Sequence, residues 1–105
     1  MKIEIDGYTI DYEFKNKELL GSNNPLIIFL HEGLGSRHQW KDFPTMLNEH
    51  KKLPMLFYSR IGYGKSDFWK KGIPENFLRY DAFITLPLLI KELGITNKII
   101  LFGHS

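Results

Sequence analysis

Three short, unbroken apolar runs constrain the fold of this 105-residue chain more than any other feature. They cover residues 26–30, 54–58 and 99–102, and each passes directly into a segment that contains glycine. Such a run, bounded by turn signals, is typical of a strand buried on both faces of a parallel sheet. Parallel strands need long crossover connections, which helices usually supply. We therefore expect three buried, parallel strands with helices between them.

The segment before the first run predicts a hairpin. Residues 2–5 and 8–14 are strand-like, and Asp6-Gly7 between them is a strong signal for a tight turn. Residues 15–25 form a polar loop. A hairpin followed by strands that alternate with helices indicates an α/β fold with a mainly parallel sheet.

Two helices are expected between the strands. The first has apolar residues at helical spacing at Trp40, Phe43, Met46 and Leu47. The second covers residues 75–93 and ends at Gly94. Pro87 should remove the hydrogen bond to the carbonyl of Phe83 and kink this helix. The side chains expected to pack in the core from these segments are Trp40, Phe43, Phe77, Phe83 and Ile84.

Composition excludes several classes of function. The chain is 43% hydrophobic and 25% charged, which is typical of a globular protein. Its net charge of +2, with lysines and arginines scattered among acids, predicts neither a nucleic acid nor a membrane partner. The absence of cysteine excludes disulfides and thiolate chemistry. Acidic residues near Met1 do not fit a signal peptide, so we expect a cytoplasmic protein.

Each of the three apolar runs leads into a loop with polar and glycine residues. These loops are His31–Ser36, Ser59–Asp67 and Gly103–Ser105. In parallel sheets, the functional loops lie at the carboxyl ends of the strands. The third loop has the first three positions of a G-x-S-x-G nucleophile elbow, in which glycines leave room for a strained turn.

Taken in this order, the three loops resemble those of the α/β-hydrolase fold family. The first resembles its His-Gly-x-x-Gly oxyanion loop, and the second its Asp-x-x-Gly-x-Gly-x-Ser turn. The resemblance covers essentially the whole chain but only the front part of the family's domain. It implies that residues 1–105 are a partial α/β-hydrolase domain, truncated at its carboxyl-terminal side.

The resemblance also implies roles for individual residues. Ser105 corresponds to the nucleophile that forms an acyl-enzyme intermediate. Gly33 corresponds to the backbone N–H donor of the oxyanion hole, and Leu34 beside it is assigned to substrate binding. The implied substrate is a small molecule with an ester, amide or related bond. No metal or organic cofactor is implied.

Other residues would shape the site without reacting. His31 corresponds to a histidine that braces its loop, and Gly35 and Gly103 to turn positions. We expect Arg60 to fix its own turn through backbone carbonyls, and His104 to point away from the neighbouring serine. Two residues depart from the family pattern. Glu32 replaces a usual glycine, and Ser59 replaces an aspartate that would be a partner for Arg60.

In this family the triad follows the order Ser, then Asp or Glu, then His. All four histidines of the chain, which are His31, His38, His50 and His104, precede Ser105. Without a base, a serine is an ordinary alcohol. We therefore expect these 105 residues alone to be inactive as an esterase.

Two alternatives compete with the hydrolase hypothesis. The chain could be a non-catalytic remnant or one half of a complementing pair, acting by binding. Its last strand would then be an exposed sheet edge, and we expect self-association through it. Less favoured is a P-loop nucleotide binder built on Gly64-Lys65-Ser66. The first glycine of that motif is replaced by Ser59, and no helix can follow directly.

Overall fold

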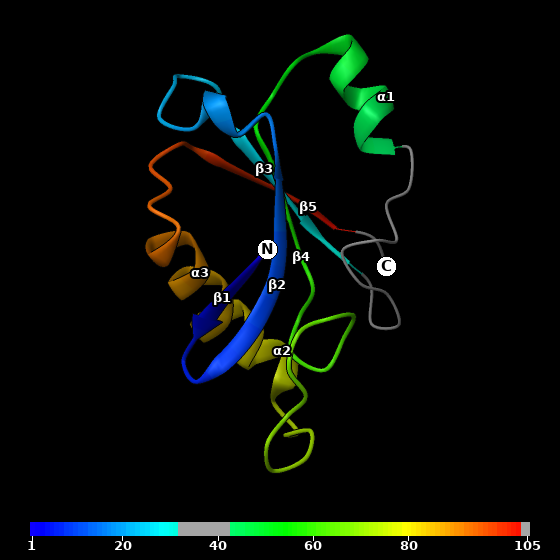
Figure 1. Cartoon of the computed structure of the whole chain (residues 1–105), viewed down its shortest axis with the longest axis vertical. Helices are drawn as coiled ribbons and strands as arrows, with labels where there is room; N and C mark the ends of the chain where they lie inside the picture. Colours follow the sequence, from blue (N-terminus) through cyan, green and yellow to red (C-terminus); the bar gives the residue numbers. More distant parts are fainter. Residues whose placement is uncertain (32–42, 104–105) are drawn as a thin grey trace.

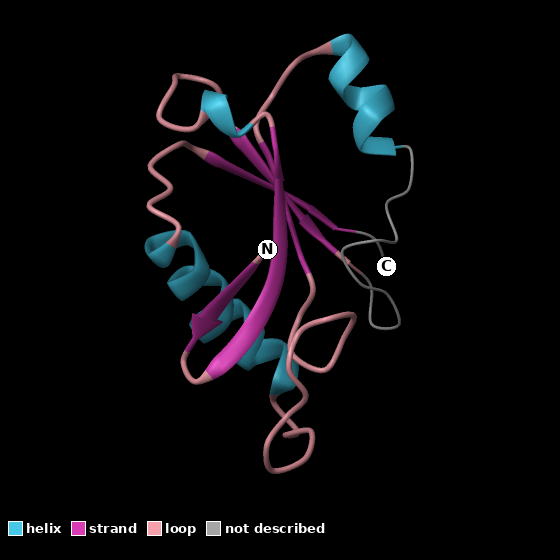
Figure 2. Cartoon of the chain, viewed as in Figure 1, coloured by secondary structure: helices cyan, strands magenta, loops and turns pink. Residues whose placement is uncertain are grey.

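A computed structural model describes residues 1–31 and 43–103 of the chain (Figure 1). The described part contains a five-stranded sheet with the spatial order β1-β2-β4-β3-β5. Its strands are β1 (Lys2–Ile5), β2 (Tyr8–Lys15), β3 (Leu26–Leu30), β4 (Met55–Tyr58) and β5 (Ile99–Gly103). Helices flank this mixed sheet, which confirms the expected α/β fold class (Figure 2).

The amino-terminal hairpin forms as predicted. Strands β1 and β2 are antiparallel, with Ile5 opposite Tyr8. The turn residues Asp6 and Gly7 have φ angles of 49° and 84°. A two-residue hairpin turn with both φ angles positive matches the right-handed twist of its strands, and Asp-Gly favours it. Strand β2 then joins the hairpin to β4, again in antiparallel pairing.

Strands β4, β3 and β5 are parallel to one another. The apolar runs of β3 and β4 supply side chains to both faces of the sheet, as alternation along a strand requires. One face buries Ile28 and Leu56 against the helix α3 (Leu86–Glu92) and the hairpin. The other face buries Phe29 and Phe57, with the helix α1 (Phe43–His50) on that side (Figure 1).

The second predicted helix is interrupted. It begins as α2 (Phe77–Tyr80), continues as a π-helical turn, η3 (Asp81–Thr85), and ends as α3. At the end of η3 the Leu86 N–H donates to the carbonyl of Asp81, five residues back. Pro87 has no N–H to continue the α-helical pattern, and the wider turn lies immediately before it. The predicted irregularity is therefore present as a π turn.

A polar loop with a short 3-10 helix, η1 (Lys17–Leu19), connects β2 to β3 and is tied to the segment before β5. The buried side chain of Asn97 makes this connection. Its Oδ1 accepts the N–H of Gly21 at 2.7 Å, and its Nδ2 donates to the carbonyls of Leu19 and Asn24 at 3.2 and 2.8 Å. One amide thereby holds the loop in shape.

Burial differs from the expectation in two places. Strand β5 was expected to be buried, but its side chains are exposed, up to 53% at Leu101. It lies at the edge of the sheet, and of the described helices only α1 contacts it in a ring contact, through Phe43 on Phe102. The expected core residues Phe83 and Ile84 are also exposed, Phe83 to 68%. Phe43 is 39% exposed although its ring packs against Phe29 and Phe102 of the sheet. Phe77 is half-buried, and Trp40 lies outside the described residues.

Candidate active site

The parallel strands bring their carboxyl ends to one end of the sheet. Leu30 at the end of β3 pairs with Gly103 at the end of β5, and Phe29 pairs with Phe57 near the end of β4. The segments that follow β3, β4 and β5 therefore start side by side, where parallel sheets place their functional loops.

His31 lies directly after β3 and is 5% exposed. Its Nε2 accepts a hydrogen bond from the backbone N–H of Arg60 at 2.9 Å. An accepting Nε2 is unprotonated, so the neutral ring carries its proton on Nδ1. The imidazole also packs against Tyr63, with ring centroids 5.1 Å apart. The side chain after β3 is thus fixed to the turn after β4.

The turn after β4 is held from within and from the neighbouring strand. Gly62 and Gly64 have φ angles of 91° and 53°, a region that favours glycine. The buried hydroxyl of Ser66 donates to the carbonyl of Ser59 at 2.6 Å and accepts the N–H of Asp11 at 2.8 Å. Both glycines and the serine of the Gly-x-Gly-x-Ser pattern therefore have a structural use in this turn.

The same bonds argue against a P-loop. The hydroxyl of Ser66 is 5% exposed and already makes two hydrogen bonds, so it is not presented to a metal or a phosphate. The described residues 59–76 contain no helix. A phosphate near Lys65 would lack the helix N-terminus that P-loops use.

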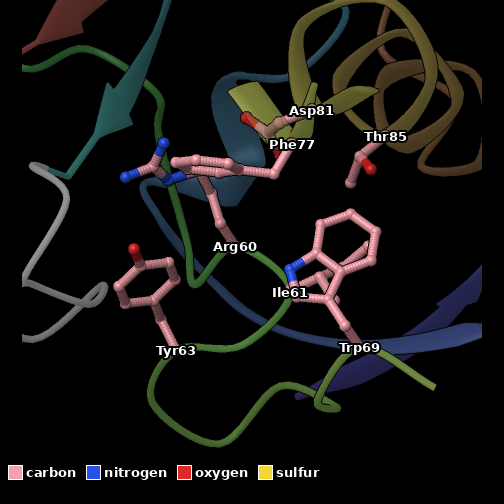
Figure 3. Close-up of a pocket in the computed structure, with 7 residues that line it drawn as sticks. All are labelled: Arg60, Ile61, Tyr63, Trp69, Phe77, Asp81 and Thr85. Atoms are coloured by element: carbon pink, nitrogen blue, oxygen red, sulfur yellow. The ribbon is translucent and has the colours of Figure 1, made fainter. Parts of the chain in front are cut away.

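The guanidinium of Arg60 lies over the ring of Tyr63, 5.2 Å from its centroid, and beside Asp81 of η3 (Figure 3). The hydroxyl of Tyr58 donates to Asp81 Oδ2 at 3.0 Å. Burial raises the pKa of Asp81, while the bond from Tyr58 and the charge of Arg60 act in the opposite direction. Burial, with the nearby charge of Asp81, raises the pKa of Tyr58 well above its usual range.

This cluster was missed by the sequence analysis, which assigned Arg60 to backbone carbonyls. Among the described residues, Arg60 Nε has no hydrogen-bond partner, and the acid nearby is Asp81 from the helix. An aspartate in an otherwise apolar-rich helix was the available signal. The partner of Asp81 could not be predicted, because Tyr58 and Arg60 come from β4 and the turn after it, more than 20 residues away along the chain.

Most residues assigned to chemistry lie outside the described part of the chain, namely Gly33, Leu34, Gly35, His104 and Ser105. Gly103 is described. A Cβ built on it would meet nothing within 4 Å among the described atoms, so crowding does not explain this glycine.

Within residues 1–31 and 43–103, no three acidic or histidine side chains are grouped so that they could hold a metal ion. The described helices are too short or too polar for any of them to span a bilayer.

Several solved hydrolase structures resemble the chain over its whole length. A predicted CIB-like hydrolase from Thermoplasma acidophilum superposes with a TM-score of 0.78 at 20% identity, covering 100% of this chain and 49% of that one. MGS-M2, an α/β-hydrolase enzyme from a Medee basin deep-sea metagenome library, superposes with a TM-score of 0.74 at 21% identity. The match covers 98% of this chain and 35% of MGS-M2. The ancestral haloalkane dehalogenase AncHLD2 superposes with a TM-score of 0.75 at 19% identity. The match covers 99% of this chain and 32% of AncHLD2.

No protein-family model and no curated protein matches the sequence. At these identities the structural likeness shows the fold alone, which is that of the amino-terminal part of an α/β hydrolase. The chain spans about a third to a half of the length of these three structures.

Proposed function

We propose that this chain is the front part of a serine hydrolase, with Ser105 as the nucleophile acting on an ester, amide or related bond. The observation that carries the proposal is the pairing of Leu30 with Gly103. Gly33 follows β3 by three positions and Ser105 follows β5 by two, so their loops start from neighbouring strand ends. A nucleophile and an oxyanion donor must be close neighbours in this type of catalysis.

In the proposed reaction, the hydroxyl of Ser105 attacks the substrate carbonyl and forms an acyl-enzyme. The backbone N–H of Gly33 stabilises the oxyanion, a contribution of about 3–4 kcal/mol for one such donor. Leu34 would contact the substrate. His31 would brace the oxyanion loop through its bond to the Arg60 N–H, because that bond fixes the residue from which the loop starts.

The base and acid of the triad would come from residues beyond Ser105. His31 is a poor base for this serine, since it is buried and its Nε2 already accepts a hydrogen bond. We therefore propose that residues 1–105 alone do not turn over substrate.

A serine-directed fluorophosphonate probe and p-nitrophenyl butyrate test this proposal on the protein as its gene encodes it. We expect labelling at Ser105 and ester hydrolysis, both lost in Ser105→Ala and retained in Thr45→Ala, which removes an exposed hydroxyl from α1. Labelling at another residue, or full activity in Ser105→Ala, would contradict the assignment. Turnover by residues 1–105 that depends on Ser105 would contradict only the proposed inactivity of the isolated segment.

The exposed strand β5 favours a second candidate, in which these residues act by binding. Its side chains are 37–53% exposed from Ile99 to Phe102, and its outer edge has no neighbouring strand in the described structure. Such an edge can pair with another strand. We propose self-association, or pairing with a complementary segment, through β5. An intact protein that binds no substrate but forms such a pair would support this candidate over the enzyme.

A further inference from the structure

A cleft of about 440 Å³ is formed by the segment that runs from the turn after β4 to the first residue of α2. Its walls include four aromatic side chains, which are Tyr63, Phe68, Trp69 and Phe77. Clefts of about 300–1,000 Å³ with mostly apolar walls are typical of small-molecule sites. A benzene ring needs only about 150 Å³, so this cleft has room for a substituted ring.

Two walls of the cleft are held in place by rings on other elements. Trp69 packs edge-on against Tyr8 of β2 and Tyr80 of α2, with ring centroids 5.5 and 5.3 Å apart. Tyr63 packs against His31, with ring centroids 5.1 Å apart. Figure 3 shows Tyr63 and Trp69 on opposite sides of a space. Because both rings already have fixed neighbours, a ligand between them would have little side-chain freedom to remove.

Two other side chains of the cleft leave much apolar surface in water. Phe68 and Ile73 line the cleft and are 77% and 74% exposed. Exposed apolar side chains around a concave surface are typical of ligand-binding grooves. An apolar ligand in the cleft would remove part of this surface from water, which is the main favourable contribution to binding of this kind.

The polarity of the walls indicates which class of ligand fits. No acid, lysine, arginine or histidine is among the described residues that line the cleft. Arg60 and Asp81 line the smaller neighbouring pocket instead. A charged ligand would therefore lose its water without gaining an ion pair. In Figure 3 the indole nitrogen of Trp69 lies on the side of the ring that faces Tyr63. Since this N–H can only donate, it suits an acceptor oxygen.

We propose that this cleft binds a neutral aromatic compound that carries an acceptor oxygen, such as an aryl ketone or an aryl ester. The ring of the ligand packs among Tyr63, Phe68 and Phe77, where edge-on and offset-stacked contacts between rings are favourable. Its oxygen accepts the hydrogen bond from Trp69 Nε1. The inference goes beyond the proposed function and does not depend on it, because no residue of the cleft takes part in the proposed reaction.

An NMR titration of isotope-labelled protein with acetophenone tests the site. We expect a saturable shift of the Trp69 indole N–H resonance, and the same shift in Ser105→Ala. Benzoate has the same ring but a charge, and ethylbenzene has no acceptor oxygen. Both should bind at least about threefold more weakly than acetophenone, because one would have to lose its water and the other would leave the indole N–H unpaired.

Variants at exposed positions assign the binding to the cleft. Phe68→Ala removes one wall and should weaken acetophenone binding about threefold or more, because apolar contact area is lost. Phe83→Ala removes an aromatic side chain that is 68% exposed on the helix layer, and it should bind acetophenone as the wild type does. Trp69→Phe keeps a ring but lacks the donor. This variant should lose the preference for acetophenone over ethylbenzene.

Four outcomes would overturn the proposal. The first is no shift at Trp69 with acetophenone, and the second is a shift confined to β5 around Leu101. Tighter binding of benzoate than of acetophenone would contradict the neutral class of ligand. A Trp69 resonance that changes with protein concentration in the absence of acetophenone would show that a second copy of the chain occupies the cleft.

Discussion

The imidazole of His31 and the backbone N–H of Arg60 are joined by a 2.9 Å hydrogen bond between the ends of two neighbouring parallel strands. The bond links the start of the loop after β3, through the buried side chain of His31, to the start of the loop after β4. The position of both loops at the candidate active site therefore depends on a side chain that does no chemistry in the proposed reaction.

Replacing His31 tests the strength of that link. His31→Phe keeps a buried ring but leaves the Arg60 N–H without an acceptor, which costs about 1–3 kcal/mol when the group stays buried. His31→Gln can place an amide oxygen near the N–H, so we expect a smaller loss. Urea denaturation of the three proteins measures the difference. Equal stability of His31→Phe and wild type would show that water replaces the imidazole.

The side chain of Asn97 is expected to stabilise the loop between β2 and β3. It bonds to the N–H of Gly21 and to the carbonyls of Leu19, Ser22 and Asn24. At about 1 kcal/mol for each well-formed bond, Asn97→Ala should lower the free energy of unfolding by about 2–4 kcal/mol. Asn23→Ala, at an exposed position of the same loop, is the control. Similar losses in both variants would contradict the role assigned to Asn97.

The buried hydroxyl of Tyr58 predicts a pH dependence of stability at high pH. Its pKa in the folded protein is well above the ordinary value of 10.0, chiefly because of burial. Above pH 10 the unfolded chain releases this proton while the folded protein keeps it, so the free energy of unfolding falls as pH rises. Tyr58→Phe lacks this contribution.

We expect Tyr58→Phe to be less stable than wild type at pH 8, because it loses the bond to Asp81. The difference in free energy of unfolding between wild type and Tyr58→Phe should become smaller as pH rises from 9 to 11. Tyr80, whose pKa burial and the bond to Asp6 raise to about 12, is present in both proteins and cancels in the comparison. Denaturant titrations at each pH provide the measurement, and a constant gap would refute the assignment.

Association through β5 should respond to charge on that strand. Leu101 is 53% exposed on β5, and Phe83 is 68% exposed on the helix layer. If the strand edge and its apolar faces carry self-association, Leu101→Lys should reduce the apparent mass in sedimentation velocity, since lysine protects edge strands. Phe83→Lys removes a comparable apolar side chain elsewhere and should have little effect. Loss of association in Phe83→Lys alone would assign the contact to the helix layer.

The strands could be predicted from the sequence because apolar runs and the Asp6-Gly7 turn are local signals. Strand β3 occupies the predicted residues, and β5 extends one residue further, to Gly103. Burial could not be predicted in the same way, since it depends on which layers cover a strand. Ile100 and Ile28 belong to similar runs, yet Ile28 is fully buried and Ile100 is 47% exposed.

The contacts of Arg60 with Asp81 could not be predicted from the sequence, because they also depend on how distant segments pack. Asp81 and Thr85 line one small pocket together with Arg60, and four-residue spacing puts both on one helix face. The spacing does not say which turn of the sheet that face packs against. Ser59 suggested that Arg60 lacked a nearby acid. The acid instead comes from a helix that packs on the sheet, a contact that no local pattern encodes.

The position of β3 between two later strands determines when its pairing can be completed during synthesis. Strand β3 is made early but lies between β4 and β5, both of which follow it along the chain. About 70 residues separate β3 from β5, so at a translation rate of about 5–20 residues per second the ribosome needs about 4–14 s to complete the second partner. During that time at least one edge of this apolar strand has no partner strand. Chaperones that hold short apolar segments would have their clearest target here.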